Sequence, residues 1–448
     1  PGQTMRFTRN DSSNLATKVF INSLRSGATH EFEENGYKRP KFLQTPKFII
    51  ESGETIEITS PYGGPVHISF DTNDLNVSFT FENIGEHAYW SSSLDNNSFT
   101  EKLNAGEFDW AEVVTSGFEV HSKLEKMRAS VMDEKWGTAS VLADATKVYM
   151  SNFPHVLAGF KGPGIDIVDE IHDFAKENNL TIETLDKVKH MNADQATCGY
   201  GCSGNPYDAY WNFNPVGHGD VHELGHGLEK SRFIFEDFEL HSITNHYSYY
   251  TKSQYNKARG FEATSCQNLP FKEVFDSLQA SVNETNSTNY LQTNLWENSG
   301  WSQQVLVLIQ AMMHTQKQNK LDNGWHLLAR LHILEREIKK VKEDWENRKN
   351  SIGFSLYSID DFNVIGKNDW LLISLSYAGK LDFSNYLTMM GIEYTQKALD
   401  QVNTFGFTKV PKEFFISTSN GYCKEDQYGS FLDKETISID GATVWIDE

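Results

Sequence analysis

The sequence lacks several features that would place it in other protein classes. No run of about 18 apolar residues occurs, so no membrane-spanning helix is expected. The longest apolar stretch, Val305–Met313, is about half that length and predicts a buried helix instead. The G-x-S-x-G pattern of serine hydrolases and the glycine-rich pattern of phosphate-binding loops are both absent. These absences leave a globular chain of 448 residues, long enough for about two or three domains.

Positive charge is also in short supply. The chain has 40 Lys and Arg residues against 61 Asp and Glu residues, which gives a formal net charge of -21. Such a surface repels a polyanion, so we expect no nucleic-acid partner. The sequence begins at Pro1 without a signal-peptide pattern, which leaves export undetermined by the sequence itself.

Cysteine is scarce as well, with four in the chain. Cys198 and Cys202 form the local pattern CGYGC, which suits a short disulfide loop, a metal clip or two free thiols. A structural zinc site would need two more cysteine or histidine ligands, and the local sequence does not offer them. We expect a Cys198–Cys202 disulfide in an oxidising compartment, with reduced thiols as the alternative. Whether Cys266 and Cys423 pair is not decided by the sequence.

The period of the hydrophobic pattern changes along the chain and predicts an α+β fold. Residues 1–40 form a polar N-terminal segment with one amphipathic helix predicted over residues 14–26. Residues 41–123 alternate apolar and polar side chains between glycine-rich turns, which predicts a β-rich, sandwich-like domain. Residues 124–415 have helical spacing and are predicted to form a mostly helical domain, and residues 416–448 form a short mixed tail.

The most informative motif is His-Glu-Leu-Gly-His, from His222 to His226. On a helix, residues four apart lie on one face, so His222 and His226 can each give an imidazole nitrogen to one zinc ion. Glu223 is offset around the helix and can act as general base on a water molecule without binding the metal. Gly225 lets a neighbouring element pack close to this helix. The motif therefore predicts a Zn²⁺-dependent hydrolase.

A catalytic zinc ion needs a third protein ligand. The metzincin pattern fails, because Glu229 and Arg232 stand where glycine and the third histidine would be. The inverted H-x-x-E-H order is absent too. Two candidates follow downstream, Glu239 and His241, and only one of them can point at the metal if this segment is helical.

The segment NPYDAYWNFNPVGHGDVHELGHGLE, followed by HSITNHYS, resembles the enhancin-like, mucin-active zinc metallopeptidases, and most closely their ImpA-type (immunomodulating metalloprotease) branch. In that family a segment patterned E-x-x-x-N-x-x-S follows the zinc motif, and its Glu is the third ligand. Asn245 and Ser248 match this pattern, but the Glu position carries His241. The resemblance thus implies His222, His226 and His241 as zinc ligands, with Glu239 out of register by two residues.

The resemblance also implies a β-rich N-terminal domain, a helical gluzincin-like (zincin-like) catalytic domain and secretion to the extracellular space. The expected function is that of a zinc endopeptidase that hydrolyses O-glycosylated, mucin-type proteins and recognises the glycan. The alternatives are a glycan-binding module with a vestigial protease site and a general zinc peptidase without glycan dependence. Tyr247 and Trp296 are weak candidates for binding substrate, although aromatic residues at such positions are more often part of the packing.

Overall fold

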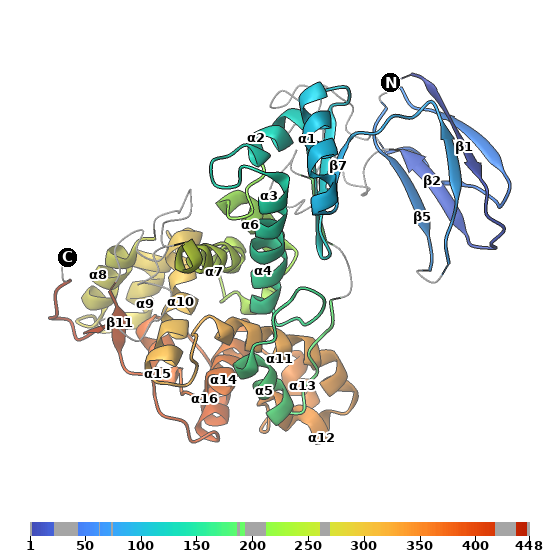
Figure 1. The fold of residues 1–448 in the computed structure, drawn as a ribbon. Helices are drawn as coiled ribbons and strands as arrows, with labels where there is room; N and C mark the ends of the chain where they lie inside the picture. Colours follow the sequence, from blue (N-terminus) through green and yellow to red (C-terminus); the bar gives the residue numbers. More distant parts are fainter. Residues whose placement is uncertain are drawn as a thin grey trace. The chain divides into compact units, whose positions relative to one another are not determined.

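The computed structural model describes residues 2–21, 44–61, 63–72, 75–185, 189–192, 212–259, 269–416 and 436–445 (Figure 1). The chain divides into two compact units: Pro1–Lys147 with Val188–Pro215, and Val148–Lys187 with Val216–Glu448. The first unit is rich in strands and the second is mostly helical, which confirms the predicted fold class. The predicted domain boundaries stay predictions. All four cysteines, and with them the predicted disulfide, lie outside the described residues.

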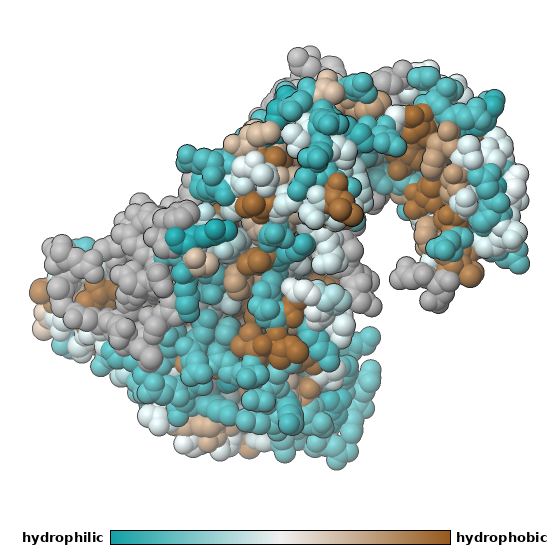
Figure 2. Space-filling view, viewed as in Figure 1, coloured by the Kyte–Doolittle hydropathy of each residue, from teal (hydrophilic) through white to brown (hydrophobic). Residues whose placement is uncertain are grey.

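The first unit begins with two antiparallel three-stranded sheets, ordered β4-β1-β6 and β3-β2-β5. Their strands are β1 (Thr4–Arg9), β2 (Thr17–Ile21), β3 (Phe48–Ile49), β4 (Thr55–Thr59), β5 (Val66–Phe70) and β6 (Phe79–Glu82). The two sheets share one small core, in which Phe7 and Ile58 of one sheet meet Val19 and Ile21 of the other. Apolar surface remains outside this core, as the brown areas of Figure 2 show.

The helix predicted over residues 14–26 is therefore wrong for Thr17–Ile21, which form strand β2. Val19 and Ile21 point into the core, and the strand pairs with β3 on one side and β5 on the other. The β-branched residues of this segment suit a strand, and cross-strand pairing outweighs the weak helical pattern.

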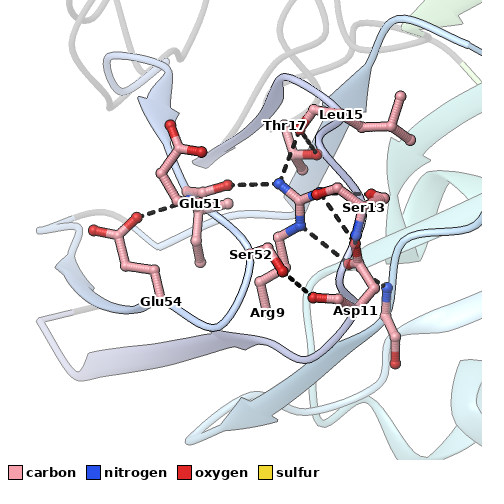
Figure 3. A network of polar contacts seen from close by, with 10 residues as sticks. Arg9, Asp11, Ser13, Leu15, Thr17, Glu51, Ser52 and Glu54 are labelled. Atoms are coloured by element: carbon pink, nitrogen blue, oxygen red, sulfur yellow. Dashed lines mark hydrogen bonds and ion pairs between the residues drawn. The ribbon is translucent and has the colours of Figure 1, made fainter.

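Arg9 holds the connection between β1 and β2 (Figure 3). Its buried guanidinium donates to the Asp11 carboxylate at 3.0 and 3.1 Å and to the carbonyl oxygens of Leu15 and Ile50, both at 2.9 Å. The bond from Arg9 keeps the pKa of Asp11 well below its usual range. These hydrogen bonds hold the buried Arg9 cation against the connection, and they thereby fix the path of the chain into β2.

A third sheet of the first unit is ordered β10-β9-β8-β7. Its strands are β7 (Ala88–Trp90), β8 (Trp110–Val114), β9 (Phe118–Lys123) and β10 (Lys189–Asn192), and the helices beside it in sequence are α1 (Asn96–Ala105), α2 (Leu124–Val131) and α3 (Ala139–Ala145). On this sheet the buried Glu112 carboxylate lies 2.6 Å from His121 Nδ1 and 3.0 Å from His87 Nε2. Burial alone would lower the pKa of His121, but its bonds with Glu112 and Glu119 raise that pKa to about 9.

The second unit is a helical assembly around α7. Its helices are α4 (Phe153–Leu157), α5 (Asp169–Glu177), α6 (His218–His226), α7 (His241–Arg259), α8 (Phe271–Ser281), α9 (Ser287–Leu291), α10 (Trp301–Lys317), α11 (His326–Glu343), α12 (Trp345–Arg348), α13 (Ile359–Asn363), α14 (Lys367–Gly379), α15 (Ser384–Met389) and α16 (Gln396–Asn403). Residues 242–253 of α7 are all buried, and this helix packs against α4, α6 and α10. A helix buried on every side belongs to the core of its domain.

Two short strands close the described part of the chain. β11 (Glu413–Phe415) pairs with β12 (Thr436–Ser438) in antiparallel register. Among the described residues, no helix has both the length and the apolar character that crossing a membrane requires.

Candidate metal centre

Helices α6 and α7 pack unusually close together, and this contact builds the site. A Cβ atom on Gly225 would lie 2.8 Å from the carbonyl oxygen of Thr244 and 3.0 Å from the ring of Tyr247. Val221 and Leu224, on the same helix, are buried. Only a residue without a side chain allows this approach, so the expectation that Gly225 permits close packing is confirmed.

The close approach brings three histidines together. His222 and His226 project from α6, and His241 is the first residue of α7. Their ring centroids are 4.7 to 5.3 Å apart, and one ligand nitrogen from each lies within 4.8 Å of the other two. Glu239 does not belong to this group. Its carboxylate lies 3.5 Å from His241 Nδ1. Three imidazoles that converge in this way suit a divalent transition-metal ion.

Asn245 links the two helices at the site. Its side-chain oxygen accepts a hydrogen bond from His222 Nδ1 at 2.9 Å, and its amide nitrogen donates to the His241 carbonyl oxygen at 2.9 Å. One turn further along α7, the Ser248 hydroxyl donates to the His218 carbonyl oxygen at 3.1 Å. The two positions that matched the family pattern in the sequence therefore both bind α6.

Glu229 is a site residue that the sequence reasoning missed. Its carboxylate lies 3.0 Å from His226 Nδ1, and its second oxygen accepts a hydrogen bond from the Thr244 hydroxyl of α7. In the sequence, Glu229 was noted only as a departure from the metzincin pattern. The spacing of three residues from His226 is the signal that could have revealed it, because residues three apart in a helical turn are neighbours.

Glu223 lies next to the cluster and is almost fully buried. Among the residues that the structure describes, its Oε2 atom has no hydrogen-bond partner. Burial raises the pKa of this carboxyl group to about 7. A buried carboxylate oxygen without a partner is costly for folding, and a pKa near neutrality suits a group that takes up and releases a proton.

The protonation of the histidines depends on their surroundings. Burial lowers the pKa of His222 to about 4, which favours the neutral form that metal ligation needs. At His226 burial acts in the same direction, but the bond with Glu229 outweighs it and raises the pKa. His218, one turn before His222, has a pKa lowered by burial and by Lys252, whose Nζ lies 3.3 Å from its Nδ1.

The two weak candidates for substrate binding are both in the interior. Tyr247 is fully buried, and its hydroxyl lies 2.6 Å from His332 Nε2. Trp296 is 4% exposed, and its indole N–H donates to the Met390 carbonyl oxygen at 2.7 Å. Neither side chain presents a surface that a substrate could reach, so both are packing residues and the predicted binding role is not supported.

No protein-family model matches this chain. The immunomodulating metalloprotease of Pseudomonas aeruginosa is 26% identical over 443 residues, which cover 93% of this chain and 48% of that protein. The chain is a homologue of the immunomodulating metalloprotease. It spans about half of the length of that relative. The predicted resemblance is thereby confirmed.

Solved structures agree with this relationship. The IMPa metallopeptidase from Pseudomonas aeruginosa superimposes with a TM-score of 0.79 at 24% identity, over 100% of this chain and 52% of that one. IMPa has also been solved in complex with T-antigen and with an O-glycopeptide. The M60 catalytic domain of Clostridium perfringens ZmpC, solved with the sialyl T antigen, matches with a TM-score of 0.51 at 11% identity, over 92% of this chain and 74% of that one. These structural similarities establish the fold of this chain.

Homology to a metalloprotease indicates a metal cofactor, and the group of His222, His226 and His241 fits its site. The fit rests on the donor set and on the buried Glu223 oxygen beside it, which no described residue hydrogen-bonds.

Proposed function

We propose that this chain is a zinc endopeptidase in which His222, His226 and His241 hold the metal. The convergence of these three imidazoles beside the buried Glu223 carboxylate, whose Oε2 atom meets no hydrogen-bond partner in the described part of the chain, is the observation that supports the proposal best. Three protein nitrogens leave a fourth position for water, as a catalytic zinc site requires. His241 is preferred to Glu239 as the third ligand because its imidazole belongs to the converging group. The Glu239 carboxylate instead lies 3.5 Å from Nδ1 of that histidine.

The chain's own residues would supply the proton transfers. When bound, zinc lowers the pKa of water towards neutrality and polarises the carbonyl group of the scissile bond. Glu223 would take the proton from the attacking water at Oε2 and pass it to the leaving amine. Burial raises the pKa of this carboxyl group, which favours its role as a group that takes up the proton and then returns it. Asn245 would keep the His222 ring turned so that Nε2 faces the metal.

The proposed substrates are O-glycosylated, mucin-type proteins, recognised in part through their sugar. Support comes from the homologue IMPa, solved with T-antigen and with an O-glycopeptide, and from ZmpC, solved with the sialyl T antigen. A sugar that binds beside the scissile bond can position that bond, so its binding energy contributes to the rate as well as to affinity. We further propose that the protein acts outside the cell, where such substrates are found.

The test compares three matched peptides that carry a bare Thr, a Thr with one GalNAc, and a Thr with an extended sialylated glycan. The zinc-loaded protein is incubated with each at one salt concentration, and mass spectrometry identifies and counts the fragments. We expect kcat/KM for the GalNAc peptide to exceed that for the bare peptide at least about tenfold, equivalent to about 1.4 kcal/mol. Glu223→Gln should bind zinc normally and lose about 10²–10⁴-fold in rate.

The outcomes separate the alternatives. Equal cleavage of the bare and glycosylated peptides would refute glycan dependence and leave a general zinc peptidase. Binding of the glycopeptides without any cleavage would indicate a glycan-binding module with a vestigial site. Cleavage by Glu223→Gln at the wild-type rate would remove Glu223 from the mechanism.

A further inference from the structure

Each histidine of the cluster makes a contact through the same ring nitrogen. Nδ1 of His222 faces the Asn245 side-chain oxygen at 2.9 Å, Nδ1 of His226 faces Glu229 at 3.0 Å, and Nδ1 of His241 faces Glu239 at 3.5 Å. An acceptor at Nδ1 selects the tautomer that carries its hydrogen there, so Nε2 becomes the ligand atom. The rings of His222 and His226 are therefore each oriented by a hydrogen-bond acceptor, whereas the Glu239 carboxylate lies only within ion-pair distance of His241.

Of the two carboxylates, Glu229 is the more firmly held. Its side chain is 11% exposed, whereas that of Glu239 is 42% exposed. One Glu229 oxygen contacts His226 and the other accepts from the hydroxyl of Thr244 on α7. Thr244 also supplies the carbonyl oxygen that lies against Gly225, at the closest approach of α6 and α7. Glu229 thus links His226 of α6 to Thr244 of α7, the residue whose carbonyl oxygen limits how closely the two helices approach.

Charge gives Glu229 a second role. Three neutral imidazoles leave the full double positive charge of a zinc ion in a half-buried site, and such a charge favours a compensating partner. The carboxylate of Glu229 lies directly behind one ligand and can compensate this charge without taking the position that water must occupy. If the third ligand were a carboxylate instead of His241, that ligand would itself neutralise part of the charge of the metal. Glu229 would then matter less for metal affinity.

We propose that Glu229 is a positioning residue for the metal, which orients His226 and supplies the negative charge that the three-histidine ligand set lacks. This inference rests on the metal site of the proposed function. Glu229 does not touch the substrate or the reacting atoms, so its effect is expected first in metal affinity and only through the metal in activity.

The experiment measures the zinc dissociation constant by competition with a chromophoric chelator, on the full chain after removal of metal. Glu229→Gln is compared with Glu236→Gln, which removes the same charge from an exposed side chain that follows closely in sequence. We expect zinc affinity to fall about 10–100-fold in Glu229→Gln and to stay unchanged in Glu236→Gln. Thr244→Val keeps the carboxylate but removes one of its anchors, and it should give a smaller loss. His241→Ala removes a ligand and sets the scale for a damaged site.

Two further readouts distinguish positioning from a general loss of structure. The melting temperature of the metal-free Glu229→Gln protein should stay close to that of the metal-free wild type. The visible spectrum of the cobalt-substituted variant should differ from that of the wild type, because the ligand geometry has changed. Wild-type zinc affinity in Glu229→Gln, or an equal fall in melting temperature with and without metal, would overturn the inference. If His241→Ala also binds zinc like the wild type, the proposed metal site itself is wrong.

Discussion

Replacing Gly225 with Ala tests whether the spacing of α6 and α7 sets the geometry of the metal site. The added Cβ atom would lie 2.8 Å from the Thr244 carbonyl oxygen, whereas ordinary contacts begin at 3.4 Å. The added atom would thus be about 0.6 Å too close to the backbone of α7, and the Tyr247 ring blocks it as well. The two helices must therefore move apart, and His222 and His226 move with α6 away from His241.

The expected cost to folding is small, because two effects oppose each other. Overpacking a core site costs about 1–3 kcal/mol, while Ala in place of Gly within a helix contributes about 1 kcal/mol. The metal site has no such compensation. Zinc–nitrogen bonds are confined to about 2.0–2.1 Å, so a shift of a few tenths of an ångström weakens ligation by all three histidines together. We expect zinc affinity to fall at least about tenfold, or about 1.4 kcal/mol.

The assay combines chelator competition for zinc with thermal unfolding of the metal-free protein. Gly366→Ala is the matched control, since a Cβ atom there meets nothing within 4 Å and Gly366 caps α14 in the same unit. Wild-type zinc affinity in Gly225→Ala, together with an unchanged melting temperature, would refute the role of close packing. A loss of zinc affinity of the same size in Gly366→Ala would show that the effect is not specific to the α6–α7 contact.

Two other predictions follow from buried polar contacts. Tyr247→Phe leaves His332 Nε2 without its hydroxyl partner and should destabilise the fold by about 1–3 kcal/mol. Zinc affinity and peptidase activity should stay unchanged. Lost activity at an unchanged melting temperature would restore Tyr247 as a substrate-binding residue. The folded-state pKa of His121 is raised from 6.5 to about 9, so its stabilising contribution, about 3 kcal/mol at most, is fully present below pH 6.5 and disappears as the pH rises through 9. Urea unfolding from pH 6 to pH 10 should show this loss in the wild type and not in His121→Gln, and equal slopes in both proteins would contradict the assignment.

The sequence by itself determined the part of the site that one helix carries. The spacing of His222, Glu223 and His226 places them through the helical period alone, so no knowledge of the rest of the fold is needed. The change from a period of two to a helical period likewise predicted a β-rich region followed by a helical one. These inferences hold because the responsible interactions are local in the chain.

Only the tertiary structure decided which residues complete the site and which aromatic residues lie outside it. Helical spacing alone left both Glu239 and His241 open as the third ligand and the family resemblance favoured His241, but it is the packing of α7 on α6 that brings His241 into the cluster. The contact of Glu229 with Thr244 joins residues from two segments and has no periodic signal. Thr17–Ile21, within the helix predicted over residues 14–26, form a strand instead, because pairing with β3 and β5 selects that conformation. Tyr247 shows the physical reason most directly, because its type and spacing are the same whether its ring is exposed at a cleft or buried, and burial depends on neighbours distant in sequence.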